Sequence, residues 1–460
     1  MMDIGVRENL SLKGRHVTVI GAARSGISAA KLLMNIGANV FLSDRDPSAG
    51  GNEEVAELMR LGVTTEFGTH SPKVHQADLL VVSPGVPQDA DIVLTASERG
   101  LPVVSEVELA SWFTELPIVA VTGSNGKTTT ATLLAQMFRQ GDYTPFLAGN
   151  IGIPFSKTVT DLFDRKPRRG IHVLEISSFQ MEHIHHFRPS VAVLLNLTAD
   201  HLDRYSSLEH YAETKMKILD NMTHEDFVIY NKDDSFLADH IRTPATRIPF
   251  SLGKNPGGLF SVNETKIYDR DHEIVAYLRE LGLPGRHNVS NFLAAATAGR
   301  TLLVPLKGIR HVMKTFRGVP HRLEHVRALD SIDFYNDSKA TNVASVRVAL
   351  DAFSRPVVLI MGGRDKGADF GELYPQISAA VREVIVLGEA ADRIERSFSG
   401  LVPCHRVTSM EGAVSLARGH ASPGDIVLLS PGCASFDMFD NFEQRGDMFR
   451  AAVNRLEGKT

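Results

Sequence analysis

The strongest chemical signal in the sequence is the loop T-G-S-N-G-K-T-T at residues 122–129. It follows the apolar run 118–121 and opens a stretch whose apolar residues have helical spacing. Glycines let backbone N–H groups converge on phosphate oxygens, Lys127 adds a positive charge, and the Thr128 hydroxyl can ligate Mg²⁺. The usual motif has a further glycine where this sequence has Val121, so the loop is a shorter variant. The pattern predicts a binding site for a nucleotide phosphate.

A second string bears on which nucleotide is bound. Asn231, Lys232 and Asp234 follow the apolar run 227–230 and resemble the N-K-x-D element that reads guanine. A GTPase would also carry a D-x-x-G element between the phosphate loop and this point, and the sequence has none there. The string is therefore interpreted as an Asn/Asp turn after a strand, and ATP is favoured.

A second glycine-rich turn, Gly21–Gly26, lies between the strand-like run 17–20 and a helical stretch. Asp44 closes the next strand, so the segment nearly fits the dinucleotide fingerprint. Ala23 replaces the middle glycine, which normally allows close approach to a pyrophosphate. We expect a nucleotide-like ligand other than NAD or FAD, with a structural turn as the alternative. The string S-P-G-V-P at 83–87 ends another strand and could close the same pocket.

Two polar residues stand at strand-like runs in the middle of the chain. Glu175 lies in the apolar stretch 173–176, where a charge is costly unless it is paired. It is a candidate Mg²⁺ ligand, with a structural salt bridge as the alternative. His201 follows the run 191–195, where α/β proteins place their chemistry, and the residue alone leaves its role open.

His183 and His186 are three residues apart and could share a helix face. No cysteine or clear third ligand accompanies them, so a solvated helix is favoured over a metal site.

Short β-branched runs alternate with helical stretches along the whole chain, which is typical of α/β proteins with buried parallel strands. The alternation restarts near residues 105 and 318. We therefore expect three domains, at 1–105, 106–318 and 319–460, with ligands at the carboxyl ends of their strands.

The composition of the 460 residues is that of a globular protein, with 43% hydrophobic and 22% charged residues. The net charge of −5 argues against nucleic-acid binding. Cys404 and Cys433 could form one bridge but no disulfide framework, and reduced thiols of a cytosolic protein are favoured. No signal peptide is evident, and no apolar run reaches the ~20 residues that span a bilayer, so we expect a cytoplasmic protein without membrane contact.

Strings spread over the whole chain resemble the Mur ligase family, which builds the peptide of bacterial cell-wall precursors. Besides the phosphate loop they are E-x-S-S-F-Q at 175–180, the segment 196–205, G-x-H-N-x-x-N at 285–291, H-R-x-E at 321–324, N-D-S-K-A-T-N at 336–342, S-P-G-C-A-S at 430–435 and N-F-E-Q-R-G at 441–446. The S-K-A-T-N and N-F-E-Q-R-G strings, with the short first domain, resemble most the members that add D-glutamate. The resemblance implies a Rossmann-like first domain, a central P-loop ATPase-like domain and a Rossmann-like last domain.

The resemblance also implies roles for individual residues. The positions that would contact a UDP-linked substrate are Ser25, Asp44, Arg45, Gly85 and Asn150. Those that would hold ATP are Gly123, Ser124, Asn125, Gly126, Lys127, Thr128, Thr129, Asn288, Asn291, Arg322 and Asp337. Those that would hold D-glutamate are Lys339, Thr341, Lys366, Ser435 and Phe442. Two Mg²⁺ ions would be held by Thr128, Glu175, His201 and Lys215, the last as a carbamate, with Lys217 as its nearby competitor. The catalytic set would be Lys127, Glu175, His201 and Lys215.

The activity so implied is ATP-dependent addition of D-glutamate to UDP-N-acetylmuramoyl-L-alanine through an acyl phosphate, by a monomer. Another Mur-type ligase, or one like folylpolyglutamate synthase, shares this chemistry. An NAD-dependent oxidoreductase would leave the phosphate loop unexplained, and a nucleotide switch would leave the strings at 336–342 and 430–446 unexplained. Two departures from the family pattern, Ala23 and Gly432 where glycine and alanine are usual, place local loop shape in question.

Overall fold

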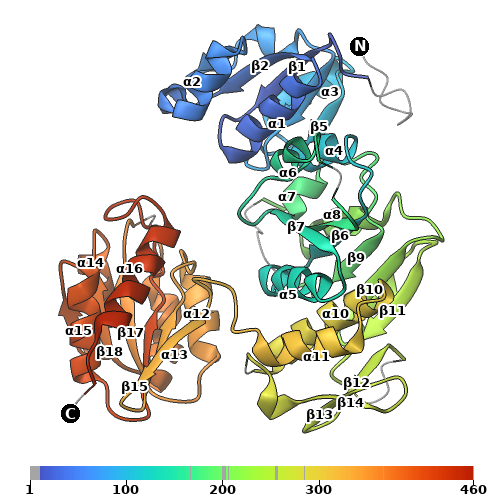
Figure 1. The fold of residues 1–460 in the computed structure, drawn as a ribbon. Helices are drawn as coiled ribbons and strands as arrows, with labels where there is room; N and C mark the ends of the chain where they lie inside the picture. Colours follow the sequence, from blue (N-terminus) through green and yellow to red (C-terminus); the bar gives the residue numbers. More distant parts are fainter. Residues whose placement is uncertain are drawn as a thin grey trace. The chain divides into compact units, whose positions relative to one another are not determined.

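The computed structural model describes residues 11–165, 167–198, 204–205, 207–253, 257–283, 285–365 and 367–458. The chain divides into two compact units, Met1–Thr315 and Phe316–Thr460 (Figure 1). The first unit holds two parallel sheets and the second unit holds a mostly parallel one, so the fold is of the α/β class, as the sequence predicts.

The first sheet has the strand order β3-β2-β1-β4-β5, and all its strands are parallel. Its strands are β1 (His16–Ile20), β2 (Asn39–Asp44), β3 (Thr64–Phe67), β4 (Leu79–Val82) and β5 (Val103–Ser105). The helices are α1 (Arg24–Asn35), α2 (Glu53–Arg60), α3 (Asp91–Glu98) and α4 (Glu106–Ser111). The strand order reverses between β1 and β4, which is where open parallel sheets bind ligands. The loops after these two strands contain Gly21 and Ser83.

The second sheet, also parallel, has the order β11-β10-β9-β6-β8-β7. Its strands are β6 (Ile118–Thr122), β7 (Thr144–Gly149), β8 (Gly170–Glu175), β9 (Val191–Leu194), β10 (Phe227–Asn231) and β11 (Thr246–Phe250). The helices are α5 (Lys127–Arg139), α6 (Phe155–Asp161), α7 (Ser178–Met181), α8 (Leu208–Met216), α9 (Ser235–His240), α10 (Arg286–Thr301) and α11 (Leu306–Thr315). β6 is buried along its whole length, which explains its continuous apolar run.

The structure also contains a small antiparallel sheet that the sequence analysis did not predict. It consists of β12 (Phe260–Val262), β13 (Lys266–Asp269) and β14 (Ile274–Tyr277). The expected Asn/Asp turn at 231–234 is confirmed, since β10 ends at Asn231 and Asp234 caps the N-terminus of α9.

Two buried carboxylates on α4 join the first two sheets into one unit. Glu108 accepts hydrogen bonds from the Trp112 indole at 2.7 Å and from the backbone N–H groups of residues 185–187 at 2.7–3.0 Å. Glu106 accepts two bonds of 2.6 Å from the backbone and hydroxyl of Ser156, and its burial raises the pKa of the carboxyl. A buried carboxylate is stabilised by such converging donors.

The prediction of a helix around His183 and His186 is wrong. The short helix α7 ends at Met181, and the histidines lie in the turn that follows it. The backbone N–H groups of this turn converge on the carboxylate of Glu108. They are therefore not available for the hydrogen bonds of a helix, and the segment curves around the anion.

The sheet of the second unit has the order β15-β16-β20-β17-β18-β19 and is parallel except for β15. Its strands are β15 (Glu324–Leu329), β16 (Ile332–Asn336), β17 (Val357–Gly362), β18 (Val381–Leu387), β19 (Cys404–Arg406) and β20 (Ile426–Leu429). Its helices are α12 (Val343–Asp351), α13 (Tyr374–Ala380), α14 (Ala391–Phe398), α15 (Met410–His420) and α16 (Phe442–Arg455). The antiparallel edge strand β15 was not predicted, because it is only half-buried and lacks an apolar run.

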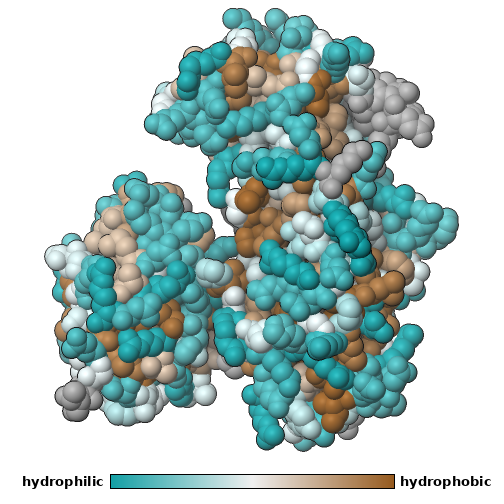
Figure 2. Space-filling view, in the orientation of Figure 1, coloured by the Kyte–Doolittle hydropathy of each residue, from teal (hydrophilic) through white to brown (hydrophobic). Residues whose placement is uncertain are grey.

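Among the described residues, none of the helices has the length and apolar character needed to cross a membrane. The face drawn in Figure 2 is mostly hydrophilic, with apolar side chains interspersed.

His172 makes the stability of the first unit depend on pH. It is fully buried on β8, and burial lowers its pKa to about 4. In the unfolded chain His172 binds a proton below its ordinary pKa of 6.5, whereas in the folded protein it does so only below about pH 4. Its contribution to the unfolding free energy is therefore complete above pH 6.5 and is lost as the pH falls from 6.5 towards 4. The protein should therefore lose about 2 kcal/mol of unfolding free energy through this group between pH 7 and pH 5. His172→Gln should abolish that part of the loss.

Urea unfolding followed by the fluorescence of Trp112, the single tryptophan and a residue of the first unit, measures this loss. His224→Gln, at an exposed position, is the matched control and should behave as the wild type. An equal loss in His172→Gln and wild type would contradict the assignment.

Candidate active site

The phosphate loop connects β6 to α5, as the sequence predicts, and is fastened to the segment after β9. The backbone N–H of Ser124 donates to the carbonyl of Asn196 at 2.9 Å, and that of Asn125 donates to the Asn196 side chain at 2.8 Å. Gly126 has a φ of +83°, and a Cβ there would lie 2.3 Å from Oδ1 of Asn291. The backbone angle therefore favours glycine at this position, and a Cβ would also displace the Asn291 amide.

The polar side chains of the loop converge at the N-terminus of α5. The Lys127 ammonium donates to the carbonyls of Gly123 and Ser124 at 2.9 and 2.8 Å, so its charge lies over the loop. Thr128 and Thr129 follow in the first turn of the helix and are buried. A lysine and backbone N–H groups at a helix N-terminus are suited to phosphate oxygens.

Glu175, the last residue of β8, lies beside this loop with only 2% of its surface exposed. Its Oε2 accepts a hydrogen bond of 2.6 Å from the Thr128 hydroxyl, and its Oε1 accepts one of 2.9 Å from the Asn150 amide. A carboxylate next to a hydroxyl is an all-oxygen donor set, which is what Mg²⁺ prefers. The residues present therefore fit the metal that the sequence predicts here.

Asn150 also lines a cavity of about 570 Å³ in the first unit, a size suited to a nucleotide-like ligand. All five residues predicted to contact the UDP-linked substrate line it: Ser25, Asp44, Arg45, Gly85 and Asn150. The S-P-G-V-P string at 83–87 forms part of its wall, as predicted. Ala23 has a φ of −88°, which any residue adopts, so the missing glycine does not disturb the turn.

The two lysines that are candidates for the carbamate, Lys215 and Lys217, contact different segments of the chain. Lys215 is 2% exposed, and its ammonium donates to the carbonyl of Gly123 in the phosphate loop at 3.1 Å. Lys217, just after α8, donates instead to the carbonyl of Glu182 at 3.2 Å. Of the two, only Lys215 contacts the phosphate loop. His201 lies outside the described residues.

Asn288 and Asn291 lie one turn apart at the start of α10, next to the phosphate-loop helix. Asn291 accepts a bond from the Thr130 hydroxyl and donates one to Asn288, both at 3.4 Å. The structure thus brings both residues to the loop that is predicted to hold ATP.

In the second unit, hydrogen bonds connect the segments that carry three of the predicted D-glutamate residues, Lys339, Thr341 and Phe442. The loop after β16 carries Lys339, whose backbone N–H donates to the carbonyl of His321 at 2.9 Å, and Thr341. The loop after β20 is bonded to it by Gly432, whose N–H donates to the carbonyl of Ala340 at 2.9 Å. The hydroxyl of Ser338 donates to the carbonyl of Phe442, the first residue of α16, at 2.8 Å.

Of the remaining two predicted D-glutamate residues, the structure describes one, Ser435, which lies on the loop after β20. Ser435 is buried and follows β20, and Lys366 lies outside the described residues.

The buried residue Arg445, which the sequence analysis quoted only within a string, holds these loops in place. Its guanidinium donates to the hydroxyl and carbonyl of Ser338 at 3.0 and 2.8 Å. It also donates to the carbonyls of Cys433, Ala434 and Gly362 at 3.1–3.4 Å. Desolvation lowers its pKa to about 10, so the cation persists at neutral pH. No pattern at the level of sequence distinguishes such an arginine from a surface one.

Asp337 and Arg322 stand at the carboxyl end of the same sheet. Burial raises the pKa of Asp337 to about 7, while hydrogen bonds from Ser430 and the Leu323 N–H and the charge of Arg322 oppose the shift. Burial thus favours the neutral form of this carboxyl more than water does, while both of its oxygens accept hydrogen bonds, from the Leu323 N–H at 3.1 Å and the Ser430 hydroxyl at 2.9 Å.

The fold and the site together define a nucleotide-phosphate-binding α/β protein with three sheet-centred domains. Three family models match the chain: "Mur ligase MurD-like, N-terminal domain" at residues 15–105, "Mur ligase middle domain" at 121–299 and "Mur ligase, glutamate ligase domain" at 321–433.

Curated relatives match over nearly their full length. A UDP-N-acetylmuramoylalanine--D-glutamate ligase from Salinibacter ruber is 45% identical, covering 96% of this chain and 98% of the relative. The protein of the same name from Chloroherpeton thalassium is 41% identical, covering 97% and 99%. The chain belongs to the Mur ligase family.

Solved structures show the same fold at low identity. The UDP-N-acetylmuramate-alanine ligase MurC from Thermotoga maritima matches with a TM-score of 0.59 at 21% identity, covering 96% of this chain and 99% of that one. The MurF ligase from Thermotoga maritima in complex with ADP matches with a TM-score of 0.58 at 17% identity, covering 98% and 97%.

Replacing Arg445 by lysine should destabilise the second unit. A lysine cannot supply the planar fork of donors, so several buried carbonyls would lose their partner. The expected cost is about 2–4 kcal/mol, visible in calorimetric thermal unfolding of the whole chain. Arg450→Lys on the same helix is the matched control, because Arg450 pairs with Glu324 at a partly exposed site and should cost less than about 1 kcal/mol. Equal effects of the two substitutions would contradict the role given to Arg445.

Proposed function

We propose that this chain is an ATP-dependent ligase that joins D-glutamate to UDP-N-acetylmuramoyl-L-alanine. The observation that carries the proposal is the position of Glu175, hydrogen-bonded both to Thr128 of the phosphate loop and to Asn150 of the cavity wall. A substrate held in the cavity can thereby present its carboxylate to the phosphate loop. The relatives named above carry this activity in their names, and they match over nearly the full chain.

The chemistry explains why a phosphate loop serves amide formation. A carboxylate and an amine do not condense in neutral water, because the carboxylate lacks a leaving group. Transfer of the terminal phosphoryl group of ATP to the carboxylate gives an acyl phosphate and ADP. The amine of D-glutamate then attacks the acyl carbon, phosphate leaves, and an amide remains.

The charges at the phosphate loop suit the first step. Lys127 would neutralise charge on the phosphoryl group as it moves, and backbone N–H groups at the start of α5 would orient it. Thr128 and Glu175, with His201, would hold Mg²⁺, which supplies further positive charge at the phosphoryl oxygens. Asn288 and Asn291, with Arg322 and Asp337 of the second unit, would hold ATP.

Lys215 would take part as a carbamate. Addition of CO₂ to its neutral amine releases a proton and converts a cation that repels Mg²⁺ into an anion that binds it. The contact of its Nζ with the carbonyl of Gly123 supports this role, because Gly123 belongs to the loop that would hold the phosphates.

D-Glutamate would be held in the second unit by Lys339, Thr341, Ser435, Phe442 and Lys366. An ammonium and hydroxyls suit a dianionic amino acid. We further propose that the protein acts as a monomer in the cytoplasm.

Phosphate release with UDP-N-acetylmuramoyl-L-alanine, ATP and a panel of amino acids tests the proposal. D-Glutamate should be strongly preferred over L-glutamate, D-alanine, L-alanine and a diamino acid, because the relatives named above are D-glutamate ligases by name and Lys339 would pair with a carboxylate. Equal release with L-alanine or a diamino acid would assign the chain to another member of the family. Nucleotide turnover without any carboxylate substrate would instead indicate a nucleotide switch.

The Lys215→Ala variant tests the carbamate. It should be nearly inactive, because a metal-binding group is lost, and acetate at high concentration should restore part of the activity by filling the vacated space. Lys217→Ala is the matched control and should remain active, since Lys217 contacts Glu182 and not the phosphate loop. Near-normal activity of Lys215→Ala would refute the metal-bridging role.

A further inference from the structure

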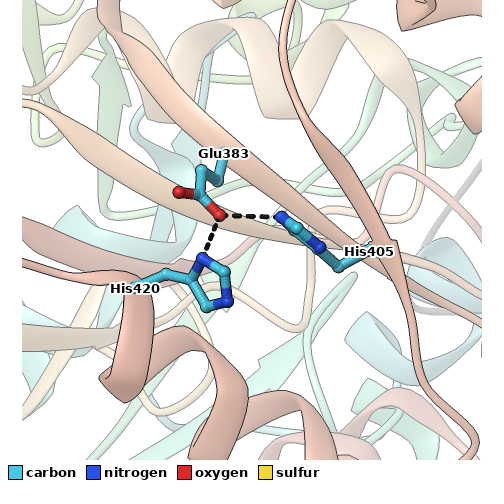
Figure 3. A group of neighbouring side chains, drawn as sticks. All are labelled: Glu383, His405 and His420. Atoms are coloured by element: carbon cyan, nitrogen blue, oxygen red, sulfur yellow. Dashed lines mark ion pairs between the residues drawn. The ribbon is translucent and has the colours of Figure 1, made fainter.

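A cluster of one carboxylate and two imidazoles in the second unit has no part in the chemistry above. Glu383 comes from β18, His405 from β19, and His420 is the last residue of α15. Both imidazoles turn towards the same carboxylate oxygen of Glu383 (Figure 3). Oε2 of Glu383 lies 2.8 Å from Nε2 of His405 and forms a second ion pair with Nδ1 of His420. The three candidate ligand atoms lie within 4.8 Å of one another.

The fold itself brings the three side chains together. His405 is paired with Ile385 across the parallel strands, and Glu383 lies two residues before Ile385, so Glu383 and His405 share one face of the sheet. Ile385 packs in the same core cluster as Ala413 and Ala417 of α15, so that helix covers this face. His420 therefore arrives at the cluster on an element that is already fixed by the core.

The close contacts leave polar atoms unsatisfied. Oε2 of Glu383 and Nε2 of His405 are buried, and within the described part of the chain neither makes a hydrogen bond of acceptable geometry, although the distance between them is that of an ion pair. Buried polar atoms without hydrogen bonds cost free energy. A cation placed among the three atoms would satisfy both of them at once.

We propose that Glu383, His405 and His420 form a binding site for one divalent transition metal ion of the zinc type. Two imidazole nitrogens and one carboxylate oxygen suit Zn²⁺, whereas Mg²⁺ prefers oxygen donors alone. In a tetrahedral site the ligand atoms lie about 3.3 Å apart, given metal–ligand bonds of about 2.0 Å. The three atoms already lie within 4.8 Å of one another, and the two imidazoles are each about one-third exposed, which leaves their side chains room to rotate to that spacing. Water occupies the fourth position.

The site stands at the opposite end of the sheet from the loops predicted to hold D-glutamate. Glu383 lies near the start of β18, whereas Ser338 and Ser435 follow the ends of β16 and β20. These strands are parallel, so the cluster is at their amino end. A metal there fastens the three-residue edge strand β19 and the end of α15 to β18. Its role is to stabilise the second unit.

Equilibrium dialysis with Zn²⁺ tests the site, using the whole chain in excess Mg²⁺ so that the phosphate-loop region is already supplied with a divalent ion. The wild type should bind one Zn²⁺ more tightly than Glu383→Gln or His420→Asn by at least tenfold, because changes even to groups outside the ligand set cost 10–100-fold. Stoichiometric Zn²⁺ should raise the thermal unfolding temperature of the wild type and leave that of the two variants unchanged.

His325→Asn is the matched control. His325 also pairs with a carboxylate, Asp333, at 2.8 Å in the same unit. Because that pair is not part of the three-ligand cluster, the variant should bind Zn²⁺ as the wild type does.

His405→Cys keeps the proposal testable if the other variants fold poorly. It retains three ligands and should add a thiolate-to-metal charge-transfer band to the spectrum of the Co²⁺-loaded protein. Zn²⁺ affinity that is equal in the wild type, Glu383→Gln and His420→Asn, or a Co²⁺ spectrum unchanged by His405→Cys, would overturn the site.

Discussion

The carboxylate of Glu175 is the group on which the arrangement of the first unit depends. It ends β8 and is held from one side by Thr128 at the start of α5 and from the other by Asn150 after β7. Gly149 allows this close approach, because a Cβ there would lie 2.3 Å from the carbonyl oxygen of Glu175. One charge therefore fixes the distance between the phosphate loop and the cavity. Burying it is tolerable because both of its oxygens accept hydrogen bonds.

The same solution recurs elsewhere in the chain with different charges. Glu108 is surrounded by the N–H groups of an irregular turn, and Arg445 by carbonyls of the loops after β16 and β20 and of the last residue of β17. Irregular loops expose backbone groups that cannot bond to one another as those of helices and strands do. A buried ion of the right sign satisfies several of these groups at once. The buried charges thus determine loop shape, and the loops in turn carry the site residues.

The sequence predicted those parts of the fold whose signal is local. The buried strands β6, β17 and β20 are continuous apolar runs, and the phosphate loop is a contiguous string between a strand and a helix. The edge strand β15 and the small sheet β12–β14 were missed, because half-buried strands lack such runs. The metal-type cluster was missed because its residues are 22 and 15 positions apart, whereas the histidines that suggested a metal by proximity lie in a turn. Roles that depend on which backbone groups surround a charge, as for Glu108, need the tertiary structure.

In a parallel sheet the two ends of the strands differ in the ligands that they can bind. Glu175 stands at the carboxyl end of its strand, and the phosphate loop, the turn at Gly21 and the loops that hold Lys339 and Ser435 follow such ends. Helix N-termini and open backbone N–H groups gather at that end, so anionic substrates are drawn there. The amino ends of the strands do not bind these anions, so side chains there can serve other functions. The cluster of Glu383, His405 and His420 occupies such an end, where the proposed metal would stabilise the sheet without competing for the groups predicted to bind phosphate or D-glutamate.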